Sequence, residues 1–168
     1  MRKLRLYLDT SVISCLEVPK QPVQEAATKA FYHHVKEKVD EIELIVSPVL
    51  LFELENCPEP KRSQLFSYLK GLKYIQLPES DEALELADLY VEAGVLSARH
   101  IRDLTHIAYA VLAKCDYIVS WNFSHFTNLR TITRVNDVNQ DNRYPSIDIV
   151  PPPTITGEDG YDRDDDSD

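Results

Sequence analysis

The chain has 168 residues, a formal net charge of −10, 43% hydrophobic residues and three cysteines. This length suits one domain with a core of its own, and three cysteines without a CxxC or His/Cys pattern argue against a disulfide scaffold or structural zinc. No apolar run approaches the roughly 18 residues of a membrane span, and no leader-like segment opens the chain, so we expect a soluble, cytoplasmic protein.

The negative charge is concentrated at the C-terminus. Residues 158–168 contain seven acids and one arginine, a net −6, which leaves −4 of the total −10 for residues 1–157. The Pro151-Pro152-Pro153 run just before this segment marks the predicted end of the fold. We therefore expect one domain over residues 1–150, followed by a Pro-rich and then acidic, disordered tail over 151–168.

Along the chain, short apolar runs alternate with helical patterns. The first half predicts strands over 3–8, 43–47 and 73–77, and helices over 23–39, 48–56 and 61–70. The second half predicts helices over 80–94, 101–114 and 134–140, a strand over 116–120, and short late strands at 132 and 147–149. Strands separated by helices predict an α/β fold, an α/β/α sandwich with a central, mainly parallel sheet.

Four polar residues stand where these elements end or begin. Asp9 follows the first strand, and Glu53 lies in the second turn of the helix that leaves the second strand. Asp103 lies in the opening turns of helix 101–114, and Asn122 comes just after the strand over 116–120. The carboxyl ends of parallel strands share one rim, so Asp9, Glu53 and Asn122 are expected there. Asp103 joins them only if its helix begins beside the first strand.

Structural explanations exist for two of these acids. Asp9 is placed to be either a helix cap or a metal ligand, and Asp103 in a first turn favours the helix dipole by about 0.3–1 kcal/mol. Glu53 fits such an explanation poorly, since it shares a helix face with the apolar Val49 and Leu50.

Carboxylates gathered at one rim need compensation, because two of them about 4 Å apart repel by roughly 4 kcal/mol at an effective dielectric near 20. Raised pKa values, basic partners or a divalent cation would each supply it. Oxygen-only ligands favour Mg²⁺ or Mn²⁺, held by Asp9, Glu53 and Asp103. Asn122 fits as a fourth ligand or as a positioner of metal-bound water. Such a site carries out phosphoryl chemistry.

Four segments resemble, in order and spacing, the successive motifs of the PIN-domain family over roughly residues 4–150. They are LYLDTSVI around Asp9, SPVLLFE ending at Glu53, DLTHIAYA from Asp103, and DYIVSWNFSHF around Asn122. The resemblance is closest to the toxin-type (VapC-like) members of bacterial toxin–antitoxin pairs. It implies a metal-dependent endoribonuclease with a PIN-like fold, a homodimer, and a small antitoxin protein as partner. It also implies Asp9, Glu53 and Asp103 as acidic ligands, whereas Asn122 stands where many members have a fourth Asp.

Further polar residues lie beside this constellation. Thr10 offers a capping hydroxyl, and Ser120 stands where many family members have Ser or Thr, so the resemblance implies a hydrogen bond from it to the site or substrate. His106 either steers a phosphate or the catalytic water, or is a hydrogen-bonded core histidine. Arg102 either holds an RNA phosphate or pairs with a nearby acid.

The sequence thus predicts a Mg²⁺- or Mn²⁺-dependent endoribonuclease that hydrolyses RNA. The alternative is a catalytically weak PIN-fold module that binds RNA or a protein partner, and both Asn122 in place of an acid and the negative net charge leave it open. A phosphatase that forms a phospho-aspartate is disfavoured, because such enzymes want a second acid where this chain has Ser11.

Overall fold

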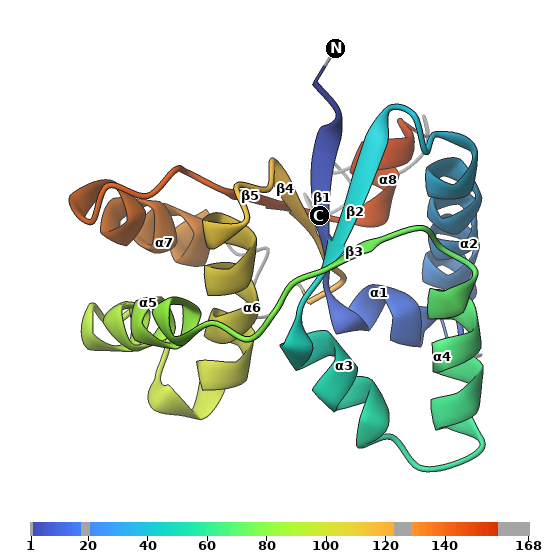
Figure 1. Ribbon diagram of the computed structural model, residues 1–168, viewed down its shortest axis with the longest axis horizontal. Helices are drawn as coiled ribbons and strands as arrows, with labels where there is room; N and C mark the ends of the chain where they lie inside the picture. The colour runs from blue at the N-terminus through green and yellow to red at the C-terminus, as the bar shows by residue number, and fades with distance from the viewer. Residues whose placement is uncertain (1, 18–20, 123–128, 158–168) are drawn as a thin grey trace, which may run out of the picture.

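The centre of the computed structural model, which describes residues 2–17, 21–122 and 129–157, is a parallel β-sheet. Its five strands lie in the order β3-β2-β1-β4-β5, and each of the four pairings is parallel (Figure 1). The strands are Leu4–Leu8 (β1), Ile42–Val46 (β2), Ile75–Gln76 (β3), Tyr117–Val119 (β4) and Asp148–Val150 (β5).

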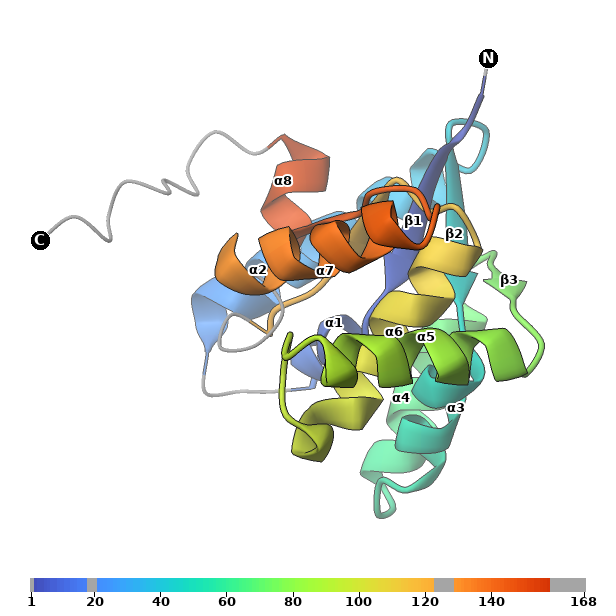
Figure 2. The ribbon, with the colours of Figure 1, turned by 90° about the vertical axis from the view of Figure 1, so that its left-hand side faces the viewer.

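Helices cover both faces of this sheet (Figures 1 and 2). One face is covered by α5 (Asp81–Glu92), α6 (Ile101–Leu112), which follows the short 3₁₀ turn η1 (Ala98–His100), and α7 (Leu129–Asp141). The other side carries α1 (Thr10–Cys15), α2 (Pro22–Glu37), α3 (Pro48–Glu55), α4 (Lys61–Lys70) and α8 (Pro152–Thr156). The predicted α/β/α sandwich is confirmed. No helix in the described part of the chain is long and apolar enough to cross a membrane.

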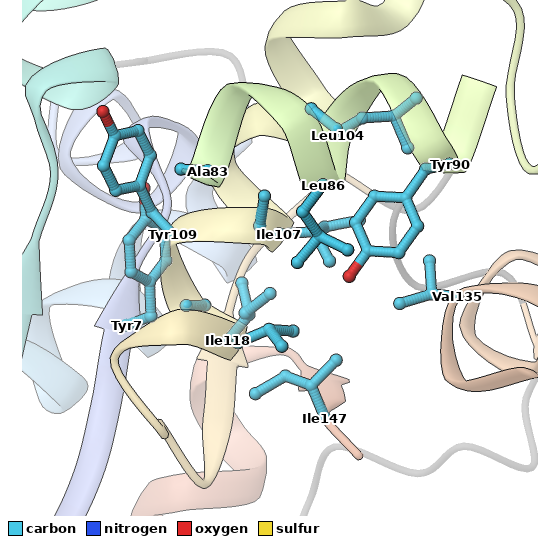
Figure 3. Packing of buried hydrophobic residues seen from close by; sticks show 14 of the residues in the cluster. Tyr7, Ala83, Leu86, Tyr90, Leu104, Ile107, Tyr109, Ile118, Val135 and Ile147 are labelled. Atoms are coloured by element: carbon cyan, nitrogen blue, oxygen red, sulfur yellow. The ribbon is translucent and has the colours of Figure 1, made fainter. Parts of the chain in front are cut away.

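The central strand β1 contributes to both cores, because successive strand side chains point to opposite faces. Tyr7 enters the core formed with α5, α6 and α7, which Figure 3 shows. Leu6 and Leu8 enter the core formed with α1, α2, α3 and α4. All three side chains are fully buried, so β1 is fixed from both sides.

Polar caps set where several helices begin. Asp9, Ser47 and Ser80 each accept a backbone N–H from the first turn of α1, α3 and α5, respectively. Such caps stabilise a helix by about 1 kcal/mol. Gly94, predicted to close α5, follows that helix in the left-handed region, with φ +75°. Asp9 is therefore a helix cap, which does not prevent its second carboxylate oxygen from having another role.

Two predicted strand segments differ in the structure. The late strand predicted at Ile132 is wrong, because this residue lies inside α7. Thr131, Val135 and Val138 are buried at helical spacing, and packing of this face outweighs the strand preference of a Thr-Ile-Thr run. The third strand is shorter than predicted, since only Ile75–Gln76 pairs with β2.

The packed chain continues beyond residue 150, where the sequence predicted the fold to stop. Pro152 and Pro153 are buried and begin α8, which lies against α2. Proline is tolerated in the first turn of a helix, where no intrahelical partner for its nitrogen is lost, so a proline run does not end a fold by itself. The predicted acidic tail at 158–168 lies outside the described residues.

Candidate functional site

The candidate site lies at the carboxyl end of the sheet, where the direction of strand addition reverses. The chain builds β2 and β3 on one side of β1 and then crosses to place β4 and β5 on the other side. Asp9 follows β1, Ser120 and Asn122 follow β4, and Glu53 lies on the helix that leaves β2. In open α/β sheets this switch point is where ligands bind.

Asp9 is held by hydroxyl groups and is only 5% exposed. Its Oδ2 accepts hydrogen bonds from Ser11 Oγ at 2.5 Å and from Ser120 Oγ at 2.8 Å. The bond from Ser120 joins the segment after β4 to the segment after β1, and Ser120 Oγ also accepts the backbone N–H of Asn122 at 3.0 Å. The other carboxylate oxygen, Oδ1, lies 3.7 Å from Nε2 of His106.

Glu53 contacts the same nitrogen of His106. Its Oε1 lies 2.5 Å from His106 Nε2 and also accepts a hydrogen bond from Thr10 Oγ1 at 3.2 Å. Two carboxylates from different elements, Asp9 and Glu53, therefore converge on one imidazole nitrogen. His106 is 1% exposed and hydrogen-bonded, so the structure supports the interpretation of a buried core histidine. Its contacts with Asp9 and Glu53 also make it part of the candidate site.

A further chain of buried hydrogen bonds lies behind His106. Its Nδ1 is 2.6 Å from the Tyr7 hydroxyl, which is 2.6 Å from Ser47 Oγ. The contact with Tyr7 also places α6 beside β1, as a site that includes Asp103 requires. Sequence reasoning missed Tyr7, Ser11 and Ser47 as site residues. The signal that could have indicated Tyr7 is its place in the strand Leu-Arg-Leu-Tyr-Leu, two residues before Asp9.

The protonation of the Glu53–His106 pair is set by its own contacts. Burial would raise the pKa of Glu53, but the hydrogen bond and charge of His106 outweigh burial and hold that pKa below its usual value. Burial would lower the pKa of His106, but the hydrogen bond to Glu53 and the charge of Asp9 raise it. Burial raises the pKa of Tyr7 well above its usual value, so its hydroxyl stays neutral. The site thus favours an imidazolium between carboxylates.

Asp103 lies one helical turn before His106, in the first turn of α6. Its carboxylate is 3.7 Å from Nδ1 of His100, and its negative charge contributes to the raised pKa of His106. The structure therefore brings Asp9, Glu53 and His106 together and keeps Asp103 within electrostatic reach of them.

Arg102 lies at the border of this constellation. Its guanidinium group stands over the ring of Phe52, 5.2 Å from the ring centroid, and its charge helps to lower the pKa of Glu53. Phe52 is 51% exposed, so this cation–π pair is on the surface next to Glu53.

The chemistry of the two carboxylates suits a metal ion, but their arrangement does not form a complete metal site. Asp9 and Glu53 supply the carboxylate oxygens that Mg²⁺ and Mn²⁺ prefer, and one oxygen of each faces Nε2 of His106. Within residues 2–17, 21–122 and 129–157, however, no group of three or more His, Cys, Asp and Glu side chains is arranged to hold a metal ion. The positive charge between the two carboxylates comes from His106.

A large hollow lies at the opposite end of the sheet. It has a volume of about 860 Å³, and its lining includes Arg2, Lys114, Asp116 and Asp148 but none of the candidate site residues. Its lining residues lie at the amino ends of β1, β4 and β5, at the other end of these strands from Asp9.

Comparison of the chain with family models, with curated proteins and with solved structures returned no match. The case for any function therefore depends on the residues themselves.

Proposed function

We propose that the protein is a Mg²⁺- or Mn²⁺-dependent endoribonuclease that hydrolyses RNA phosphodiester bonds. The observation that carries this proposal is the convergence of Asp9 and Glu53, from different elements, at the switch point of a parallel sheet. Two carboxylates in one partly buried place cost free energy unless a cation compensates them, and such a cost is commonly kept at functional sites.

Each residue of the site has a distinct task in this proposal. Asp9 and Glu53 would hold the metal ion, Asp103 would contribute a nearby negative charge from α6, and Asn122 would complete the site or orient water. When bound, the ion supplies a nucleophilic water at neutral pH and stabilises the charge that develops at phosphorus. The Ser120 hydroxyl, which donates to Asp9 Oδ2, turns Oδ1 toward the centre of the site.

RNA would approach across the surface that carries Arg102 and Phe52. The guanidinium group can bind a phosphate, and the half-exposed ring beside it offers a face for a base. The resemblance to toxin-type PIN domains extends the proposal to a cytoplasmic toxin that forms a homodimer and is neutralised by a small antitoxin. Sedimentation equilibrium and a search for a short neighbouring reading frame test that extension.

A second candidate function is a PIN-fold module that binds RNA or a protein partner with little or no catalysis. It is favoured by the imidazole of His106, which supplies the charge between Asp9 and Glu53 without a metal ion. The negative net charge of −10 points the same way.

Cleavage of labelled single-stranded RNA distinguishes the two functions. The wild-type protein is incubated with Mn²⁺, with Mg²⁺ or with chelator, beside the variants Asp9→Asn and Asp116→Asn. Asparagine caps a helix as well as aspartate does, so Asp9→Asn is expected to fold and to lose at least about 100-fold in cleavage. Asp116→Asn is the matched control, because Asp116 accepts a hydrogen bond from Arg2 at the other end of the sheet. This variant should cleave RNA as well as the wild-type protein does.

The outcomes separate cleanly. Cleavage that persists in chelator or in Asp9→Asn contradicts the metal-dependent mechanism. Metal-independent RNA binding without any cleavage supports the binding module instead.

A further inference from the structure

A continuous line of buried polar groups connects the beginning of α3 to the candidate site. Ser47 caps α3, its hydroxyl meets Tyr7, Tyr7 meets His106 Nδ1, and His106 Nε2 meets Glu53. Ser47 and Tyr7 are 0% exposed and His106 is 1% exposed, so water does not compete for these hydrogen bonds. Buried polar groups of this kind are rigid when every member has a partner.

The line has a fixed direction at its outer end. An ionised carboxylate can only accept hydrogen bonds, so the Nε2 that faces Glu53 must carry a proton. The other ring nitrogen faces the Tyr7 hydroxyl, which can donate to a neutral imidazole or accept from an imidazolium. Tyr7 therefore holds the ring of His106 in the same orientation in either protonation state.

Rigid elements hold both partners of this contact. Tyr7 lies on the central strand with its ring edge-on to His106, at a centroid distance of 5.7 Å and an interplanar angle of 73°. Both ends of the line belong to α3, since Ser47 caps the helix and Glu53 lies in its second turn. The line thus ties the orientation of Glu53 to β1 and α6.

We propose that Tyr7 is a positioning residue that fixes the Glu53 carboxylate through His106. This inference rests on the proposed function, in which Glu53 binds a divalent cation. Partners behind a ligand orient it, and their removal typically weakens metal binding about 10- to 100-fold.

The test variant is Tyr7→Phe, which keeps the ring and removes only the hydroxyl. Tyr90→Phe is the matched control, because Tyr90 lies in the same core cluster and is also 0% exposed (Figure 3). Its hydroxyl donates to Asn139 Oδ1 at 2.5 Å, a neutral partner outside the candidate site. Tyr7→Phe removes two buried hydrogen bonds, to Ser47 and His106, and Tyr90→Phe removes one, so a general effect of losing a buried hydroxyl appears in both variants.

Two readouts are compared. The first is the NMR signal of the His106 Nε2–H, which Tyr7 does not touch; Tyr7→Phe is expected to shift it or broaden it by faster exchange, and Tyr90→Phe is not. The second is Mn²⁺ affinity measured by calorimetry, expected to fall about 10-fold in Tyr7→Phe and to stay unchanged in Tyr90→Phe. Ser47→Ala, which removes the partner behind Tyr7, should change both readouts in the same direction and serves if Tyr7→Phe does not fold.

The positioning role of Tyr7 and the proposed nuclease function can fail separately. In one outcome, wild-type protein binds Mn²⁺ and cleaves RNA, but Tyr7→Phe matches Tyr90→Phe in both readouts. The positioning role of Tyr7 is then overturned, whereas the nuclease proposal stands. If wild-type protein neither binds Mn²⁺ nor cleaves, the nuclease proposal fails, and the Nε2–H signal alone decides whether Tyr7 orients His106. An unchanged Nε2–H signal in Tyr7→Phe then overturns the positioning role of Tyr7 as well.

Discussion

Both ends of the parallel sheet hold acidic side chains, but their partners differ. At the amino end, Asp116 accepts from the Arg2 guanidinium at 2.7 Å and from the backbone N–H of Arg5 at 2.8 Å. Glu43 on β2 pairs with the guanidinium group of Arg5. Arginine stays charged at every pH at which the protein folds, so the acids at this end have permanent counter-charges.

At the carboxyl end, the acids share a histidine and hydroxyl groups. Asp9 and Glu53 both face His106, and hydroxyls of Ser11, Ser120 and Thr10 supply further hydrogen bonds. An imidazole can lose its charge near neutral pH, and hydroxyls carry none. The acids Asp116 and Glu43 are therefore neutralised by arginines within the fold, whereas Asp9 and Glu53 keep negative charge that a ligand can use.

A glutamate-to-glutamine substitution at each end of the sheet should give the strongest contrast in RNA cleavage. Glu53→Gln removes a proposed metal ligand and is expected to lower RNA cleavage at least about 100-fold, with a parallel loss of Mn²⁺ affinity. Glu43→Gln weakens the pairing with Arg5 and is expected to leave cleavage unchanged. Cleavage assays on both variants, with folding checked by circular dichroism, measure this contrast.

Equal cleavage by Glu53→Gln and wild type would remove the functional distinction between the two ends. Equal losses in both variants would show that cleavage reports stability rather than site chemistry.

The second effect concerns the amino end alone. Arg5→Met removes a half-buried guanidinium that pairs with Glu43 and donates twice to the carbonyl oxygen of Ala113, at 3.2 and 2.8 Å. Groups left without partners cost about 1–3 kcal/mol, which lowers the melting temperature by roughly 2–12 °C in a domain of this size. Calorimetry measures the loss, and cleavage at 25 °C should be retained. A variant as stable as wild type would contradict the structural role of this end.

The third effect is the pH dependence of stability at the carboxyl end. The pKa of Glu53 is lowered on folding, so its contribution is present above its unfolded value near 4.5 and lost as pH falls through the folded value. The pKa of His106 is raised, so its contribution is complete below its unfolded value near 6.5 and lost as pH rises through the folded value. The pair is therefore expected to stabilise the fold most between these two values.

Urea unfolding from pH 4 to pH 9 measures this window. One additional bound proton changes the free energy of unfolding by at most about 1.4 kcal/mol per pH unit. In Glu53→Gln the decline above pH 6.5 should be smaller, because the main cause that raises the His106 pKa is absent. Parallel pH curves for the variant and wild type would mean that the pair does not set this dependence.

Much of the fold follows from local signals in the sequence. The strand predicted over 3–8, the helix start at Ser80 and the helix end at Gly94 depend on short-range features, and the structure confirms them. Elements that the sequence did not predict, such as α1, depend on tertiary packing. The six residues of α1 are too few to form a helix alone, and they do so beneath the Asp9 cap with Val12 and Ile13 buried.

The candidate site was predictable only in part. Strand ends placed Asp9 and Glu53 on one rim, because parallel topology requires it. The role of His106 depends on the lateral position of α6 against β1, which no periodicity along the chain reports. Tyr7 was hidden for the same reason, since a buried tyrosine in a strand is ordinary until its hydroxyl is seen to meet an imidazole.

The smallest effect is expected at the outermost ion pair of the amino end. Arg2 lies 2.7 Å from Asp116, but its side chain is 75% exposed, so water and salt screen the attraction. Arg2→Ala should change the free energy of unfolding by less than about 0.5 kcal/mol, because Asp116 keeps the N–H of Arg5. Chemical unfolding in low and high salt measures it. A loss comparable to that of Arg5→Met would mean that the amino end works as one cooperative network, and that its permanent counter-charges stabilise the sheet more than the exposure of Arg2 implies.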